Sequence, residues 1–244
     1  MVNDDYFTWS CIGCNETGFL DIYCPKCNGL LQFIPDSFVK AETTKSTSDY
    51  KNYIFTGRYH CLNCKEPVII TGTGYSNEFN LTYYDPDDIL YTPLFFTPTI
   101  HLFKIHPKCP QKVRNEIIRS FSLFWHDIDS CVNKLRLSLE LLMNSQKINK
   151  TAAIDGKKSK HKLTLHKRID LFKKKNQKVG EILEAIKWIG NKGSHADNKL
   201  IVNEVIDAYE LLEHALNELY EPPKDPIYDL AKQINKRKGA HPKW

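Results

Sequence analysis

The sequence lacks any uninterrupted apolar run of about 18 residues, the length that a helix needs to cross a membrane, so we expect no membrane partner. It also lacks the apolar core of a secretory leader, because it begins Met-Val-Asn-Asp-Asp. Neither sign of charge dominates, and a net charge of +5 says little about partners. We therefore expect an intracellular, cytoplasmic protein, in which thiols stay reduced and paired cysteines bind metal instead of forming disulfides.

Cysteine, by contrast, is abundant and paired. Six of the eight cysteines form three Cys-x-x-Cys pairs: Cys11/Cys14, Cys24/Cys27 and Cys61/Cys64. Two thiolates at this spacing hold one metal ion from a tight turn, and two such turns complete a tetrahedral zinc site. Apolar, strand-like residues flank the second and third pairs, and strand, metal turn and strand is the pattern of a zinc ribbon.

The pairing of these cysteines stays open at this point, and so does the number of zinc ions, one or two. Six thiolates do not divide into whole four-ligand sites. Either the first two pairs join across a short loop, or one of them joins Cys61 and Cys64 across a long loop. A closed site of four thiolates leaves no coordination position for a substrate, so we expect a structural zinc that stabilises a small β unit.

The rest of the N-terminal part contains no phosphate-binding loop. Residues 71–75, Thr-Gly-Thr-Gly-Tyr, are not followed by a helix that carries a Lys, so we expect a turn there. Residues 40–49 are polar and predict a loop. Between residues 91 and 110, prolines alternate with apolar residues, which favours an extended segment or an edge strand. We place the end of a β-rich domain, residues 1–108, after this segment.

From Gln111 onward the apolar period becomes helical. Five apolar stripes predict the helices of a bundle: residues 113–124, 128–142, 163–172, 182–189 and 201–219. The expected fold class is therefore α+β, with a small N-terminal zinc ribbon followed by an all-α bundle of about five helices over residues 109–221. Residues 222–244 are expected to form a loose, polar and basic tail.

Polar groups enter this bundle at two places. Arg136 and Glu140 lie four residues apart near the apolar side of the second helix, so they can touch. Asn191 and His195 follow the fourth stripe, where Gly190 and Gly193 end the helix. We expect these side chains to share one hollow. The alternatives are a solvated pair on the helix surface and a His that is hydrogen-bonded at the end of the fourth helix.

A basic segment runs from Lys147 to Lys178. It holds twelve Lys or Arg against Asp155 and Asp170, a net charge of 12 − 2 = +10. Such a density of charge could hold the phosphate backbone of RNA or another nucleic acid by releasing counterions. The alternative is a solvated loop and helix face whose charge is balanced by acids elsewhere.

Taken together, these motifs resemble a bacterial family called domain of unknown function 4145. The likeness covers most of the chain and is strongest in residues 110–113, 136–140, 165–169 and 190–195, which include Arg-x-x-x-Glu, Leu-His-Lys-Arg-Ile and Gly-Asn-x-x-x-His. The family's helical half is similar to the HEPN superfamily, whose bundles often dimerise and often cut RNA. Members joined to restriction-type modules imply a phage-defence setting.

The resemblance implies roles for five residues in a metal-independent endoribonuclease. His195 would act as general acid or base at an RNA 2′-hydroxyl. Arg136 or Lys187 would stabilise the charge of the phosphorane. Asn191 would orient the phosphate, beside Glu140.

The chain departs from the usual HEPN nuclease signature, which is Arg, four to six residues, then His. Positions 190, 189 and 188 hold Gly, Ile and Trp, and Lys187 lies one position beyond the window. This departure argues against cleavage. The expected function is thus an RNA-binding defence protein, and the alternative is a non-catalytic homodimer or interaction module that docks onto a larger effector.

Overall fold

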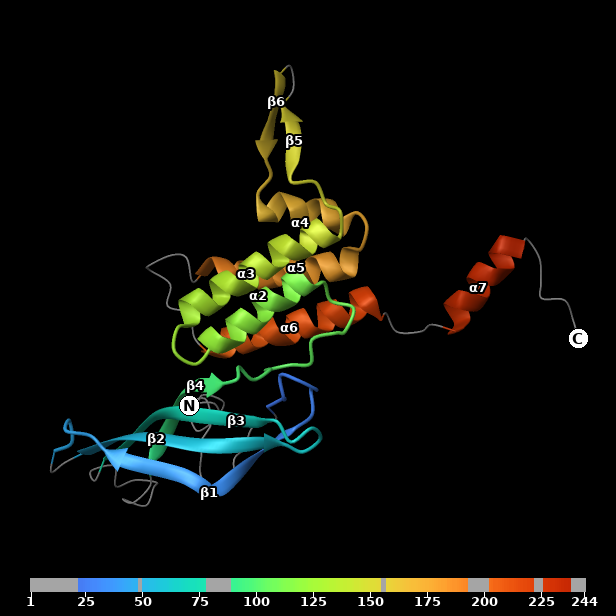
Figure 1. The fold of residues 1–244 in the computed structure, drawn as a ribbon. Coiled ribbons are helices and arrows are strands. Elements are labelled where there is room, and N and C mark those ends of the chain that lie inside the picture. Colours follow the sequence, from blue (N-terminus) through green and yellow to red (C-terminus); the bar gives the residue numbers. More distant parts are fainter. Residues whose placement is uncertain are drawn as a thin grey trace, which may run out of the picture.

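The computed structural model describes residues 22–47, 50–77, 89–154, 157–192, 202–221 and 226–237. Its N-terminal part is a four-stranded antiparallel sheet, and its C-terminal part is helical with an inserted hairpin. Figure 1 shows the sheet at one end of the helical bundle and the hairpin extending from the opposite end. The predicted α+β class is confirmed. The described residues contain six helices, where the sequence predicted about five.

The sheet is a meander in the order β1-β2-β3-β4. The strands are β1 (Leu31–Glu42), β2 (Tyr50–Cys61), β3 (Pro67–Asn77) and β4 (Leu90–Thr97). Side chains alternate between its faces, since Phe55 and Tyr59 on β2 are buried whereas Ile54 is exposed. The proline-rich segment supplies the edge strand β4, as predicted. An edge strand is where Pro is tolerated in a sheet, and Pro93 lies on β4 at the edge of the described sheet.

The Gly-containing stretch at residues 71–75 lies inside β3, so the predicted turn is wrong. Gly72 pairs with Phe55 on one side and Pro93 on the other, beside an irregularity in the β3–β4 register. A Cβ at Gly72 would overlap the carbonyl oxygen of Thr92 and the Phe55 ring. The glycine therefore permits close approach of two strands and a ring instead of reversing the chain.

We expect Gly72→Ala to destabilise the sheet by about 1–3 kcal/mol or more, because the Thr92 carbonyl is backbone and cannot move aside without shifting β4. Urea denaturation gives the free energy of unfolding. The matched control is Gly190→Ala in helix α5 (Gln177–Lys192), where a Cβ meets only side-chain carbons at 3.7 and 3.8 Å. Alanine should stabilise that helix by up to about 1 kcal/mol. Equal stabilities for the two variants would contradict this account.

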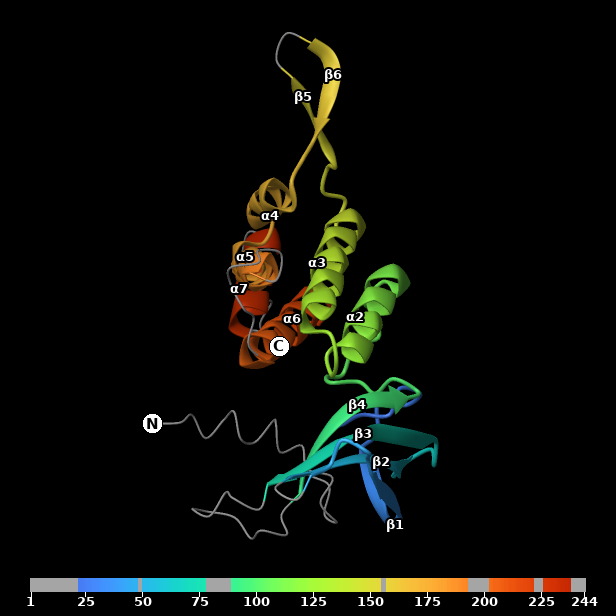
Figure 2. The same cartoon turned by 90° about the vertical axis from the view of Figure 1, so that its left-hand side faces the viewer.

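The helical part carries one apolar stripe per helix, as the sequence predicted. Its other elements are α2 (Gln111–Leu123), α3 (Ile128–Ser145), β5 (Thr151–Ile154), β6 (Lys157–Lys162), α4 (Leu165–Lys173), α6 (Val202–Tyr220) and α7 (Pro226–Arg237). Figure 2 shows α3 between α2 and the α4–α5 pair, and α6 also packs against α5. Side-chain caps start two of these helices: Asp127 accepts from the N–H of Ser130, and Thr164 accepts from that of Lys167.

Two parts of this half differ from the sequence prediction. The basic segment contains the antiparallel hairpin β5–β6, which shows no apolar alternation in sequence. The tail expected to be loose contains helix α7, on which Ile227, Leu230 and Ile234 recur at helical spacing but remain exposed. None of the helices in the described residues combines the length and low polarity required to span a membrane.

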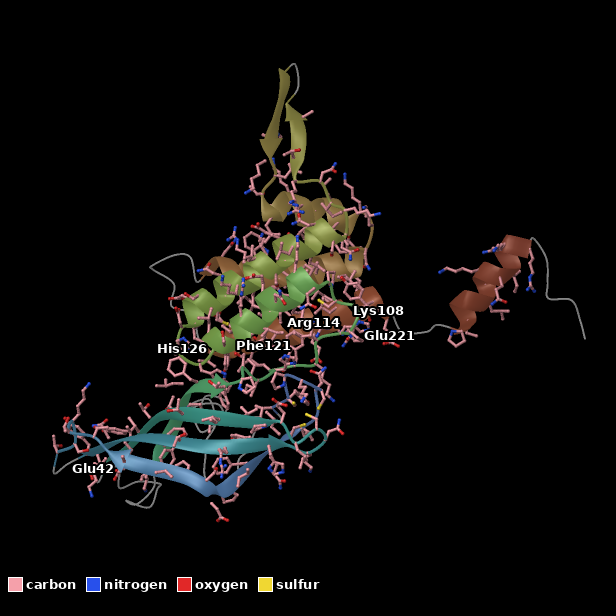
Figure 3. The ribbon with its side chains drawn as sticks, viewed as in Figure 1. Glu42, Lys108, Arg114, Phe121, His126 and Glu221 are labelled. Atoms are coloured by element: carbon pink, nitrogen blue, oxygen red, sulfur yellow. The ribbon has the colours of Figure 1, made fainter. Side chains whose placement is uncertain are left out.

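The segment between β4 and α2 joins the sheet to the bundle. The ring of Phe96 on β4 lies 4.9 Å from that of Trp125, which follows α2. Farther along, Lys108 Nζ donates to the carbonyl oxygen of Tyr220 at the end of α6, 3.4 Å away. Figure 3 shows Lys108 and Glu221 together at that side of the bundle. The boundary at residue 108 itself stays a prediction.

Candidate metal centre and cationic pocket

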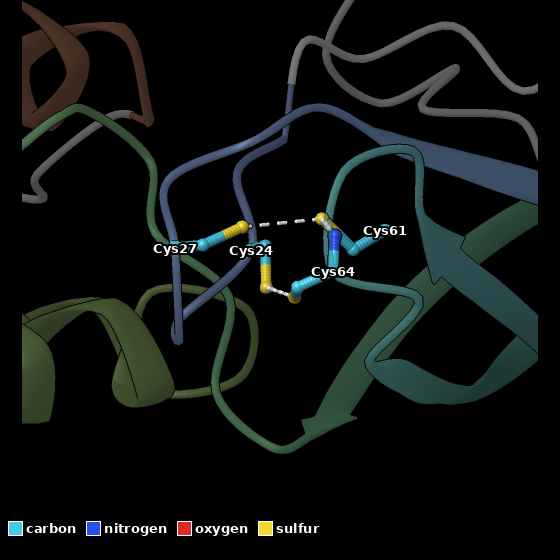
Figure 4. A group of neighbouring side chains, drawn as sticks. All are labelled: Cys24, Cys27, Cys61 and Cys64. Atoms are coloured by element: carbon cyan, nitrogen blue, oxygen red, sulfur yellow. Dashed lines mark hydrogen bonds between the residues drawn. The ribbon is translucent and has the colours of Figure 1, made fainter.

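Four of the six predicted metal ligands converge at one end of the sheet. Cys24 and Cys27 lie in the turn before β1, whereas Cys61 ends β2 and Cys64 lies in the turn before β3. Figure 4 shows the two pairs facing each other, with Sγ–Sγ distances of 3.6 Å for Cys24–Cys64 and 3.4 Å for Cys27–Cys61. All four sulfur atoms lie within 4.8 Å of one another.

The two turns have the same construction. In the first, the N–H of Asn28 donates to the carbonyl oxygen of Cys24. In the second, the N–H of Lys65 donates to that of Cys61. Asn28 and Lys65, each directly after the second cysteine of its pair, adopt left-handed φ values of 57° and 59°. Such a turn directs both of its sulfur atoms to one point, as a metal-binding knuckle requires.

The spacing of the sulfur atoms fits a tetrahedral ion. Bonds of about 2.3 Å from zinc to sulfur would separate the sulfur atoms by about 3.8 Å, close to the two distances above. The structure thus joins the second and third pairs across the long loop. Cys11 and Cys14 lie outside the described residues. The four cysteines could hold a metal ion such as zinc, and this donor set leaves no open position for a substrate.

As free thiols, these cysteines would differ in acidity. Burial raises the pKa of Cys24 to about 12, whereas the N–H of Gly29 and then the Cys61 thiol lower the pKa of Cys27 to about 6. A bound cation would favour the thiolate form of every ligand. Two other cysteines, Cys109 and Cys131, are buried in the bundle, where burial raises their pKa values to about 11 and 12. Inert thiols of this kind suit a packing role.

The residues of the expected catalytic hollow separate into three groups. Arg136 Nη1 donates to Asn191 Oδ1 at 2.7 Å, which brings α3 and α5 together at this point. Glu140 lies one turn after Arg136, and both residues line a cavity that is described below. Glu140 forms no ion pair within the described residues. His195 lies outside the described residues.

Lys187, the third of these groups, is almost fully buried and is not among the residues that line that cavity. Its Nζ lies 3.2 Å from His166 Nδ1 and 3.1 Å from the centroid of the Trp188 ring. Burial is the main cause of its lowered pKa.

Arg168, on α4, is a buried cation that the sequence did not single out. It is 5% exposed. Its Nη1 donates to the carbonyl oxygen of Glu140, and its Nη2 donates to Asn144 Oδ1 and the carbonyl oxygen of Ile148. The signal was present, because position 168 falls on the same apolar stripe as Leu165 and Phe172.

A cavity of about 370 Å³ opens beside Arg168, between α3, α4 and the base of the hairpin. Its lining residues are Arg136, Glu140, Asn144, Lys150, Lys162, Leu163, Thr164, Leu165 and Arg168. Four cationic side chains thus face one carboxylate, a formal charge of 4 − 1 = +3. Within the described residues, none of the four forms an ion pair, and the buried Nε–H of Arg168 has no hydrogen-bond partner.

A second group of metal-ligating types, His166, Asp170 and Glu184, lies between α4 and α5, with ligand atoms within 4.8 Å of one another. The amines of two lysines already contact the members of this group. Lys173 Nζ lies 2.6 Å from a carboxylate oxygen of Glu184, and Lys187 Nζ contacts the His166 ring. Ion pairs and hydrogen bonds with these lysines therefore satisfy the polar atoms of this group.

Residues 119–237, from within α2 to the end of α7, match the family described as "Domain of unknown function (DUF4145)". The matched range contains the cationic cavity, whereas the four clustered cysteines and the sheet lie before it. No curated protein and no solved structure matches the chain.

Proposed function

Because the chain carries a DUF4145 domain in residues 119–237, whose description names no activity, we propose a function from the geometry, namely that the cavity beside Arg168 binds the phosphate backbone of RNA. In this proposal the four-cysteine cluster holds a structural zinc ion that fixes the sheet. The defence setting, the dimer and the larger effector stay predictions of the resemblance.

The single observation that carries the proposal is the buried, unpaired positive charge in the cavity. Removing a guanidinium from water is costly unless an anion or hydrogen-bond acceptors compensate. Arg168 has acceptors for Nη1 and Nη2 but none for Nε–H in the described residues, and no carboxylate there forms an ion pair with it. Glu140 offsets part of this charge at a distance, and a phosphate group in the cavity would supply further opposite charge.

The sequence of the hairpin adds further lysines next to those of the cavity. Strand β6 has the sequence Lys-Lys-Ser-Lys-His-Lys, and it projects from the bundle in both views. Its last residue, Lys162, also lines the cavity. A sequence with this density of lysine favours a polyanionic partner. The backbone of an RNA strand could thus run from the hairpin into the cavity.

The proposal includes binding and no cleavage step. The cation nearest to the HEPN signature position, Lys187, is directed toward His166 and the Trp188 ring. Its amine is buried and does not line the cavity. Arg136 retains access to the cavity, and its bond to Asn191 orients the guanidinium there.

We expect Lys150→Ala/Lys162→Ala to weaken the binding of a fluorescein-labelled single-stranded RNA, measured by fluorescence anisotropy across a salt series. Each phosphate that the protein no longer neutralises reduces the slope of log K against log salt by about 0.7, so the double variant should reduce it by about 1.4. Both lysines are exposed, so the fold should persist.

The matched control is Lys40→Ala/Lys45→Ala, which removes the same charge from the exposed end of β1 and the loop after it. This pair should leave the slope within about 0.3 of the wild-type value, less than half the effect of one phosphate. A wild-type protein that binds no RNA would overturn the proposal, and so would equal reductions of slope in the two variants.

A further inference from the structure

The exposed indole of Trp188 identifies the class of RNA that this site would take. Trp188 lies on α5 and is 55% exposed, more than any other aromatic side chain whose burial the structure describes. The amine of Lys187 lies over one face of its ring, 3.1 Å from the centroid. Since that amine is itself buried, the exposed area of the indole belongs to its other face and its edges.

Two neighbouring residues link the indole to the cavity. Asn191, which binds Arg136 of the cavity, follows Trp188 by three residues, so the two side chains share a face of α5. On the other side, the Trp188 ring is 5.9 Å from that of His166, whose neighbour Leu165 lines the cavity. One helical turn of α5 and one residue of α4 therefore connect the indole to the phosphate-binding groups.

We propose that Trp188 stacks an unpaired base of a strand whose backbone lies in the cavity, so that the site takes single-stranded RNA in preference to duplex. This inference rests on the proposed function. A positively charged groove with an adjacent exposed aromatic ring is the arrangement by which proteins hold single strands without reading sequence. A base in a duplex is stacked between its neighbours and cannot offer its face to the indole.

The test compares Trp188→Ala and Trp188→Phe with the wild-type protein on three labelled probes of equal length: oligouridylate, an abasic ribose-phosphate oligomer and an RNA duplex. We expect Trp188→Ala to weaken oligouridylate binding about 5- to 150-fold. It should change binding of the abasic oligomer and the duplex less than about twofold, and leave the salt slope unchanged because no charge is removed. Trp188→Phe, which keeps an aromatic face, should retain most of the affinity.

The matched control is Tyr75→Ala, which removes an exposed aromatic ring from β3 of the sheet. It should leave all three affinities unchanged. The inference is overturned if Trp188→Ala binds oligouridylate as the wild type does, or if its affinity for the abasic oligomer falls equally. In either case the proposed function stands as long as the lysine variants still reduce the salt slope, whereas a wild type that binds none of the probes removes both.

Discussion

The purified chain is expected to contain one zinc ion held by Cys24, Cys27, Cys61 and Cys64, and Cys61→Ser is expected to lose it. Structural zinc contributes about 10–16 kcal/mol of apparent binding energy in small peptides that fold only with metal. Here the sheet has a core of its own, so we expect about 5 kcal/mol of that energy to appear as reduced stability. In a chain of this size such a reduction lowers the melting temperature by about 10–20 °C.

Metal analysis and thermal melting, each with and without a chelator, measure the two effects separately. Cys109→Ala is the control, because it removes a buried thiol of the bundle and leaves the cluster intact. It should retain the zinc of the wild type and show the same response to the chelator, apart from a small packing loss. Less than one zinc per wild-type chain would refute the site, and so would a Cys61→Ser variant that retains the full metal content.

This cluster also illustrates how much the sequence could establish. The Cys-x-x-Cys spacing and its flanking apolar residues predict two knuckles, because a knuckle is a local turn. The partner of each knuckle depends on the pairing of β1 with β2, in which Leu31 lies opposite Cys61. That register brings the Cys24 turn to the Cys61 turn, and no local pattern in the sequence encodes it.

Most of the helices could be predicted because their signal is local. Helices α2, α3, α4, α5 and α6 each present a regular apolar stripe to the bundle core, so their periodicity predicts them. Hairpin β5–β6 was not predicted because its sequence has no apolar alternation. Helix α7 was not predicted because it follows Pro222 and Pro223, which are typical of the end of a helical region. At Gly72, a residue typical of turns serves close packing against Phe55.

The cationic cavity was only half predictable. Arg136 and Asn191 were expected to share a hollow because both interrupt apolar helices, and the structure does bring them together. In the sequence, Arg168 is one more charge of the Lys147–Lys178 segment. Its burial follows from how α4 packs beside the C-terminal part of α3 and the loop after it, where the carbonyl oxygens of Glu140 and Ile148 accept from its guanidinium. Its position on the apolar stripe of α4 was the local signal of its burial. Its hydrogen-bond partners depend on the tertiary structure.

Arg168→Ala is expected to lower the free energy of unfolding by about 2–5 kcal/mol, measured by urea denaturation. Its guanidinium holds the Asn144 side chain and the carbonyl oxygens of Glu140 and Ile148. Each buried acceptor left without a donor costs about 1–3 kcal/mol. Removing a buried charge returns part of this cost, and the burial that lowers the pKa of Arg168 indicates the same opposing effect. The three hydrogen bonds outweigh it.

Two further variants separate this structural role from charge. Arg168→Lys keeps the charge but lacks the fork that reaches three acceptors, so it should lose most of the same stability. Arg136→Ala removes one bond to a half-buried amide and should cost only about 0.5–1.5 kcal/mol. If Arg168→Ala unfolds within about 0.5 kcal/mol of the wild type, the size of an ordinary surface substitution, Arg168 does not anchor α4 to the end of α3. Its buried charge would then serve the cavity alone, and ligand binding would have to compensate for burying it.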